Sequence, residues 1–314
     1  MKKNRWLVVV NPHAGSGKCR KDWPVIQKSL EKYLVFDTVF TEYPKHAITL
    51  VRNALAEGYR KLISVGGDGT LNEVVNGIFL YHASISSEII LGVITVGTGN
   101  DWGRTHQMPS DYQEMARVIN ERNLVKHDVG KAKYQHALES ESRYFLNIAG
   151  MGFDALVAKK VNVLKSKGYG GILVYMASLI GSLFQFNLPQ VKILSHHKEL
   201  YNGKAFLVAI GICRYNGGGM KLLPGADPFD GLLDVTLVKK VSKFKVAANL
   251  SKVFNGSFTK LKEVATFRGS QFVIESIPSH SLHLETDGES LGKSPILFEI
   301  LPGALSIIVP NLHK

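Results

Sequence analysis

Three glycine-containing loops in the first third of the chain each follow a short apolar run. Their sequences are Asn11-Pro12-His13-Ala14-Gly15-Ser16-Gly17-Lys18, Val65-Gly66-Gly67-Asp68-Gly69-Thr70-Leu71-Asn72-Glu73 and Thr95-Val96-Gly97-Thr98-Gly99-Asn100-Asp101-Trp102. Glycine lets the backbone approach a phosphate closely and direct its N–H groups at it. A helix that begins at such a loop adds its positive N-terminal end. The three loops together predict a binding site for a polyphosphate.

The second loop has the most specific pattern, because it places a carboxylate among phosphate-binding glycines. Asp68 would repel a phosphate unless a cation lies between them, so it is a candidate ligand for Mg²⁺ or for water bound to Mg²⁺. The alternative is a tight turn in which Asp68 caps the following helix. The third loop repeats the combination of glycine, hydroxyl, amide and carboxylate, and two such loops at adjacent strand ends can clamp one polyphosphate.

The first loop is a weaker indication by itself. It resembles a P-loop, but Pro12 stands where that motif requires glycine and Cys19 where it requires serine or threonine. Glycine-rich turns after a first strand are also common without any ligand.

The three loops follow predicted strands of an α/β domain. Leu7–Val10 is a continuous apolar run, typical of a strand that is buried on both faces. The pattern predicts strands over 7–10, 35–41, 62–65 and 91–94, and helices over 22–32 (with Asp22 as N-cap), 46–57, 71–81 and 111–120. This alternation predicts a parallel sheet with helices on both faces, and ligands bind such sheets beyond the carboxyl ends of the strands.

After Asp128 the pattern changes to that of an antiparallel, strand-rich domain. Strands are predicted over 133–138, 144–148, 191–195, 205–212, 232–238, 272–277 and 282–285, and helices over 155–165, 172–186 and 243–254. The tail predicts two more strands within 296–309, around Pro302-Gly303. We therefore expect a first domain over 1–129, a second over 130–295, and a tail, 296–314, that could pack on either.

The net charge of +12 favours a polyanionic partner. Two lysine clusters contain no acidic residue: Lys239, Lys240, Lys243, Lys245, Lys252, Lys260 and Lys262, and Lys159, Lys160, Lys165 and Lys167. No zinc finger, RNP motif or basic-aromatic pattern argues for nucleic acid, so an anionic membrane surface is the better expectation. The uncharged stretch 168–191 is interrupted by glycine, proline and polar residues, which favours a buried or cleft-lining helix over a membrane span.

Two features bear on the cellular compartment. Cys19 and Cys213 lie far apart and match no metal-ligand spacing, which favours a reducing environment. The apolar run Trp6–Val10 is too short for a signal-peptide core. We expect a cytoplasmic protein that associates peripherally with the inner face of the membrane.

The ordered set of motifs resembles the diacylglycerol kinase and sphingosine kinase superfamily, in its bacterial lipid kinase branch. The resemblance rests on Asn11-Pro12 with Gly15, Gly66-Gly67-Asp68-Gly69-Thr70, Gly97-Thr98-Gly99-Asn100-Asp101, the segment 147–154, Asn216-Gly217-Gly218-Gly219 continuing into 224–226 and 230–235, and Asp287-Gly288-Glu289. NAD kinases share the Gly-Gly-Asp-Gly core, whereas the full set in this order is specific. Thr95 stands where many relatives have proline, which removes no ligand.

The resemblance implies a nucleotide-binding α/β domain of the NAD kinase and phosphofructokinase type and an antiparallel β-rich sandwich domain, with ATP and Mg²⁺ between them. The implied ATP contacts are Asn11, Gly15, Thr41, Gly66, Gly67, Asp68, Gly69, Thr70, Leu71, Asn72, Thr98 and Asn100. It also implies that Glu289 is the general base, with Asp68 and Asp101 as further catalytic groups. A structural Mg²⁺ would bind Asp227, Asp230 and the Leu232 carbonyl, although Asp230-Gly231 also suits an ordinary turn.

The sequence therefore predicts an ATP-dependent lipid kinase that phosphorylates a lipid hydroxyl, that of diacylglycerol or a related glycerolipid. The alternatives are an NAD-kinase-like enzyme that phosphorylates a soluble hydroxyl and a non-enzymatic, basic membrane-binding protein. The apolar segment 172–186 disfavours the first alternative, and the intact Asp68, Asp101 and Glu289 disfavour the second. The sequence does not specify the lipid or the oligomeric state, and it is compatible with a homodimer.

Overall fold

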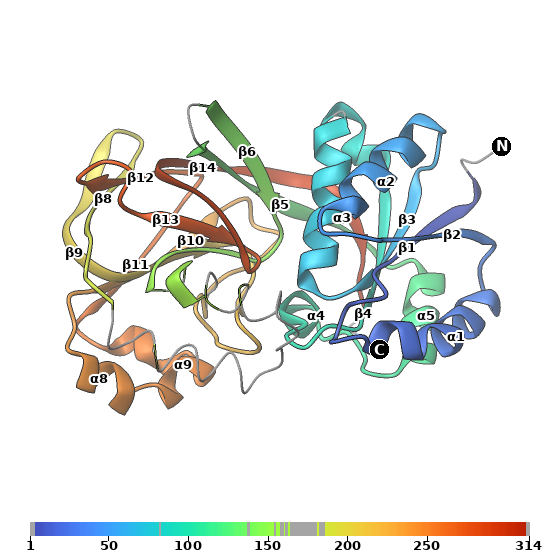
Figure 1. Ribbon diagram of the computed structural model, residues 1–314, viewed down its shortest axis with the longest axis horizontal. Coiled ribbons are helices and arrows are strands. Elements are labelled where there is room, and N and C mark those ends of the chain that lie inside the picture. Colours follow the sequence, from blue (N-terminus) through green and yellow to red (C-terminus); the bar gives the residue numbers. More distant parts are fainter. Residues whose placement is uncertain are drawn as a thin grey trace. The chain divides into compact units, whose positions relative to one another are not determined.

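The computed structural model (Figure 1) describes residues 4–81, 83–136, 139–153, 155–157, 160, 163, 181 and 186–311. The chain divides into two units, Met1–Asp128 with Pro302–Lys314, and Val129–Leu301. The sequence predicts this boundary near Gly130 and leaves the tail to either domain, whereas in the structure only residues from Pro302 onward join the first unit.

The first unit contains a parallel sheet. Its strands are β1 (Trp6–Val10), β2 (Phe36–Phe40), β3 (Lys61–Gly66) and β4 (Ile90–Thr95), followed at one edge by the end of β14 (Glu289–Ile308). Their order is β2-β1-β3-β4-β14, and the pairings between these neighbours are parallel. The carboxyl ends of β1, β3 and β4 therefore lie side by side.

Helices cover both faces of this sheet, as predicted (Figure 1). They are α1 (Lys18–Glu31), α2 (His46–Ala56), α3 (Asp68–Tyr81), α4 (Asp101–Thr105) and α5 (Tyr112–Glu121), and a 3₁₀ helix, Ala83–Glu88, follows α3. Val8 and Val10 pack in a core with Ile26 of α1 and Ile119 of α5. Because strand side chains alternate between faces, the intervening residues face the opposite layer, which α2 and α3 form.

The predicted start of the first helix, with Asp22 as its N-cap, is wrong. Gly15, Ser16 and Gly17 all have positive φ angles (61°, 58° and 86°), and this left-handed run turns the chain so sharply that α1 already begins at Lys18. Asp22 lies inside α1, where its carboxylate accepts a hydrogen bond of 2.6 Å from the Tyr112 hydroxyl of α5. That contact joins the two helices on the same face of the sheet.

The second unit is rich in antiparallel strands. They are β5 (Leu124–His136), β6 (Glu139–Phe145), β7 (Ile148–Gly152), β8 (Gln190–Ser195), β9 (Lys198–Gly211), β10 (Leu233–Lys239), β11 (Val264–Gly269), β12 (Gln271–Ile277), β13 (His283–Thr286) and most of β14. The pairings β9-β7-β13-β14-β12-β8 return to β9, so these six strands form a closed ring of antiparallel neighbours. Closure pairs both edges of each of these strands.

Three predicted elements of the second half differ in the structure. The strand predicted over 144–148 is divided between the end of β6 and the start of β7. The tail forms one long strand, β14, instead of two, because the backbone N–H of Gly303 at the expected break donates to Asp128 Oδ1 (2.7 Å). The helix predicted over 243–254 is two helices, α8 (Lys243–Ala248) and α9 (Ser251–Asn255), and a 3₁₀ helix, Ser257–Lys260, follows them. The Leu250 N–H bonds to the Ala247 carbonyl, three residues back, so the first helix tightens and ends there.

The predicted helices over 155–165 and 172–186 lie for the most part outside the described residues. Within the described part of the chain, no helix is long and apolar enough to cross a membrane.

Candidate functional site

The three glycine-containing loops meet at the carboxyl edge of the sheet in the first unit. The backbone N–H of Asn11 donates to the Val65 carbonyl (3.0 Å), and that of Val96 donates to the Gly66 carbonyl (2.8 Å). The Asn11 side chain also donates to the Thr70 hydroxyl (3.0 Å), which links the first loop to the start of α3. The polar residues that the sequence singles out in these loops therefore belong to one cluster.

Glycine is required in this cluster because the loops touch through their backbones. A Cβ on Gly97 would lie 2.6 Å from the Gly67 Cα, and one on Gly15 would lie 2.4 Å from the Val96 carbonyl oxygen. Any larger side chain would push the loops apart. The glycines thus have a packing role in addition to the phosphate contacts predicted for them.

Asp68 connects the second loop to the third. Its two carboxylate oxygens accept hydrogen bonds from the backbone N–H groups of Asp101 (3.1 Å) and Trp102 (3.0 Å). Asp68 therefore caps α4 rather than the helix that it begins itself. A carboxylate oxygen has two lone pairs, so it can accept a hydrogen bond and coordinate a hard cation at the same time. Asp68 and the buried Asp101 both carry the carboxylate oxygens that Mg²⁺ prefers as ligands.

At several other predicted ATP contacts, the side chain is buried or hydrogen-bonded within the protein. Leu71 is 3% exposed, and Asn72 is fully buried, with its backbone carbonyl and its Oδ1 each accepting a hydrogen bond from Asn76 Nδ2. Asn100 Oδ1 accepts a bond of 2.7 Å from the Gly97 backbone N–H, which shapes the third loop. At Leu71 and Asn72, only the backbone remains suited to a phosphate.

Thr41 lies at the rim of a hollow beside the first loop. The hollow has an empty volume of about 840 Å³, including its open mouth, and Arg20, Trp23 and Phe40 contribute to its lining. The rings of Trp23 and Phe40 meet edge to face, with centroids 5.6 Å apart. A cationic and aromatic wall next to a phosphate-type loop suits the base and sugar of a nucleotide.

The buried imidazole of His127 is hydrogen-bonded to α4. His127 Nδ1 bonds to the Asp128 carbonyl oxygen (2.5 Å), so this nitrogen carries the proton and Nε2 is an acceptor. Trp102 Nε1 donates to that Nε2 (3.3 Å). Burial lowers the pKa of His127 to about 4, which keeps the ring neutral and preserves this arrangement near neutral pH.

In the second unit, Asp287 anchors the turn that carries Glu289. Asp287 has a φ of 49° and is 9% exposed, and its carboxylate accepts bonds from the backbone N–H groups of Leu146, Asn147 and Ile148 at 3.2–3.3 Å. The nearby Glu285 is buried and accepts from the Gly288 N–H (2.7 Å). The hydrogen bonds of Glu285 and Asp287 therefore hold the turn Asp287-Gly288-Glu289 in place.

We expect Asp287→Asn to lower the free energy of unfolding by about 2 kcal/mol, measured by chemical denaturation. The amide loses the negative charge, and its NH₂ group would face one of the backbone N–H donors. An unchanged unfolding free energy would mean that the turn holds its shape without the carboxylate.

Glu289 begins β14 and forms an ion pair with Arg143 of β6. The distance between Arg143 Nη2 and Glu289 Oε2 is 2.5 Å, and the Arg143 side chain is 7% exposed against 24% for Glu289. The guanidinium therefore orients a carboxylate that remains partly accessible. The sequence does not predict the role of Arg143, because nothing in the surrounding hairpin distinguishes it from a solvent-facing arginine.

The three residues predicted to bind a structural Mg²⁺ lie in one turn. Asp227 accepts from the Phe229 N–H (3.1 Å), and Asp230 accepts from the Leu232 N–H (3.0 Å). Arg268 of β11 pairs with Asp230 and with Asp234, at 3.3 Å from the latter. Carboxylate and carbonyl oxygens are ligands that a hard cation prefers, but a Mg²⁺ here would share Asp230 with the Arg268 guanidinium.

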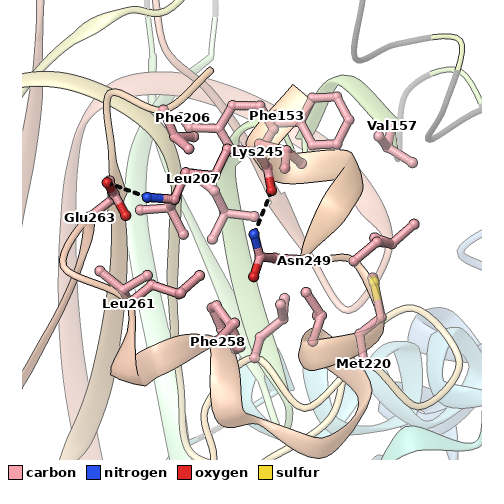
Figure 2. Close-up of a pocket in the computed structure, with 17 residues that line it drawn as sticks. Phe153, Val157, Phe206, Leu207, Met220, Lys245, Asn249, Phe258, Leu261 and Glu263 are labelled. Atoms are coloured by element: carbon pink, nitrogen blue, oxygen red, sulfur yellow. Dashed lines mark hydrogen bonds and ion pairs between the residues drawn. The ribbon is translucent and has the colours of Figure 1, made fainter. Parts of the chain in front are cut away.

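An apolar pocket lies between α8–α9 and strands β9 and β10 (Figure 2). Its empty volume is about 800 Å³, including the mouth, and nearly all the lining is aliphatic or aromatic. Phe153, Phe206 and Leu207 line one part, and Phe258 and Leu261 another. Lys245 and Glu263 form an ion pair of 2.8 Å at the pocket. That hydrogen bond lowers the pKa of the Glu263 carboxyl, which keeps the pair charged.

Comparison with known proteins covers nearly the whole chain. A family model described as the diacylglycerol kinase catalytic domain matches residues 5–132, and one described as the YegS C-terminal NAD kinase beta sandwich-like domain matches residues 147–309. A diacylglycerol kinase of Staphylococcus aureus is 30% identical over 310 residues, which are 98% of this chain and 93% of the relative. One from Staphylococcus saprophyticus is 29% identical over 98% of this chain and 96% of its own length.

Solved structures share the fold. A candidate diacylglycerol kinase from Bacillus anthracis superposes with a TM-score of 0.77 at 25% identity, over 99% of this chain and 96% of that chain. Yeast NADH kinase complexed with NADH superposes with a TM-score of 0.57 at 12% identity, over 98% and 84% of the two chains, which shows a common fold only. From the glycine loops of the first unit and these full-length matches, we conclude that the chain belongs to the diacylglycerol kinase and sphingosine kinase superfamily, in its bacterial lipid kinase branch.

Proposed function

We propose that this protein is an ATP-dependent lipid kinase that transfers the γ-phosphate of ATP to the hydroxyl group of diacylglycerol or a related glycerolipid. The observation that carries the choice of a lipid is the apolar pocket of the second unit, whose lining is suited to hydrocarbon. The relatives named diacylglycerol kinase, which match over nearly their full length, support the same choice.

The loop cluster of the first unit would bind ATP. The backbone N–H groups of the second and third loops and the N-terminus of α3 suit the phosphates, and the hollow beside Thr41 suits the nucleoside. Asp68 and Asp101 would hold Mg²⁺. When bound, the ion would neutralise charge that develops on the transferred phosphoryl group.

Glu289 would act as the general base for the acceptor hydroxyl. An alcohol must lose its proton as its oxygen attacks the γ-phosphorus, and a positioned carboxylate accepts it. The ion pair with Arg143 fixes the direction of one carboxylate oxygen, Oε2, and the carboxylate remains partly accessible to a substrate. Asp287 would contribute by holding the turn that presents Glu289.

The acceptor would be reached at an anionic membrane surface on the cytoplasmic side, with the protein bound peripherally. The excess of lysine and arginine over acidic residues supports this location. A soluble-substrate kinase of the NAD kinase type shares the fold, but a pocket lined mainly by hydrocarbon offers few polar groups for a dinucleotide.

The test is phosphate transfer from radiolabelled ATP by the purified protein. We expect labelled product with dioleoylglycerol in mixed phosphatidylglycerol and phosphatidylcholine vesicles, and none with NAD. Val238→Phe, which places a larger side chain at the pocket wall, should raise the KM for dioleoylglycerol several-fold and leave the KM for ATP unchanged.

Val35→Phe is the matched control, because Val35 is 65% exposed and belongs to the first unit. If Val238→Phe left the KM for the lipid unchanged, the pocket would not hold the acceptor. Labelling of NAD but not of lipid would establish the alternative function.

A further inference from the structure

Helix α8 exposes an aromatic side chain that the fold does not use. Phe244 is 84% exposed, the highest value among the large apolar side chains of the described residues. Phe254 of α9 is 41% exposed. A single exposed apolar side chain is common on a protein surface, so Phe244 gains meaning from its nearly complete exposure and from the charges in its segment.

Other side chains of the same segment line the apolar pocket. Val246, Leu250 and Val253 line it, and Asn249 Nδ2 donates to the Lys245 carbonyl (2.8 Å) at the end of α8. Lys245 is held by Glu263 of the neighbouring segment (Figure 2). These contacts fix the orientation of α8, so Phe244 cannot turn inward without breaking them.

The segment that carries the two exposed aromatic residues is rich in lysine. The segment from Lys239 to Lys262 contains seven lysines and no acidic residue. Lys240, Lys243 and Lys252 are exposed, as are Lys260 and Lys262. Lys239 and Lys245 are half-buried, and the Lys245 ammonium group pairs with Glu263.

We propose that α8 and α9 form a membrane-insertion surface, in which Phe244 enters an anionic phospholipid bilayer and the surrounding lysines contact the headgroup phosphates. This proposal rests on the proposed function, because it supplies the contact through which an acceptor lipid would be reached. An aromatic ring among lysines matches the layered chemistry of a bilayer surface, with hydrocarbon beneath a plane of negative charge. Residues of the same segment also line the apolar pocket. A membrane bound at this surface would therefore lie next to the pocket that is proposed to take the lipid.

Vesicle sedimentation tests the surface without any kinase assay. Phe244→Ala should weaken binding to vesicles with 30% phosphatidylglycerol by about tenfold, which corresponds to loss of one buried aromatic side chain. Lys240→Glu with Lys243→Glu should weaken it further, by roughly fivefold per lysine, and only the lysine contribution should disappear at high salt.

Phe229→Ala is the matched control, because Phe229 is also exposed (46%) in the same unit but lies between Asp227 and Asp230. Equal binding of Phe244→Ala and the unmodified protein would overturn the proposal. So would a change in oligomeric state of Phe244→Ala in analytical ultracentrifugation without vesicles, since the surface would then be a contact between copies of the chain.

The depth to which residue 244 enters the bilayer is measured with Phe244→Trp. We expect its fluorescence to shift to the blue and to be quenched by brominated lipids, relative to the unmodified protein, and no quenching would refute insertion. Activity separates this proposal from the proposed function: Phe244→Ala should retain turnover on detergent-dispersed diacylglycerol. A protein that inserts Phe244 but phosphorylates no lipid would contradict the proposed function alone.

Discussion

Glu289→Gln is expected to lower the turnover number by roughly a hundredfold or more, with ATP affinity largely preserved. The amide has nearly the same shape as the carboxylate, and its oxygen can still accept the hydrogen bond from Arg143. It cannot take a proton from the acceptor hydroxyl. The loss should therefore fall on kcat, while binding of a fluorescent ATP analogue stays near that of the unmodified protein.

Glu299→Gln provides a matched control for this substitution. Glu299 lies on the same strand, β14, and also pairs with a cation, Lys133, at 2.9 Å. The structure gives it no part in the turn of Asp287, so its turnover should be unchanged. A collapse of ATP affinity in Glu289→Gln, or an equal loss in both variants, would show that Glu289 has a structural role and that another group is the base.

Asp68→Asn is the second substitution with a large expected effect, a loss of most of the activity, roughly tenfold to a hundredfold. Two causes act together. The neutral amide is a poorer ligand for Mg²⁺, and its NH₂ group would face one of the backbone N–H donors of Asp101 and Trp102. The fold should remain intact, because the sheet beneath these loops does not depend on Asp68.

The dependence of turnover on Mg²⁺ concentration separates these causes. If Asp68 holds the ion, Asp68→Asn should require more Mg²⁺ for half-maximal activity. Asp111→Asn is the control, because Asp111 also caps a helix, α5, by accepting two backbone N–H bonds, from Gln113 and Glu114, at its Oδ1. An unchanged Mg²⁺ requirement would leave Asp68 with only its capping role, and unchanged turnover would remove it from the catalytic groups.

Local patterns in the sequence were sufficient to predict the alternating strands and helices of the first unit and the strand-rich second unit. The continuous apolar run Leu7–Val10 indicates a strand buried on both faces, and the helical period of apolar residues over 112–121 indicates a helix buried on one face. The three glycine loops were also readable, since parallel strands must present their carboxyl ends at one edge of the sheet.

The predicted ends of helices and strands are wrong where neighbouring residues or distant hydrogen bonds override a local sequence pattern. Asp22 has the side chain of an N-cap, but the left-handed run of Gly15, Ser16 and Gly17 starts α1 earlier. The break between α8 and α9 and the continuity of β14 through Pro302 depend on individual hydrogen bonds that no periodicity records.

The pairing of charged groups was decided by the tertiary structure alone. Asp68 accepts from residues more than thirty positions away, Asp287 anchors residues 146–148, and Glu289 meets Arg143 across 146 positions of sequence. A carboxylate has the same appearance in a sequence whether it binds a metal, caps a helix or orients beside an arginine. Which of these it does depends on the donors that folding brings within about 3 Å, and those come from distant parts of the chain.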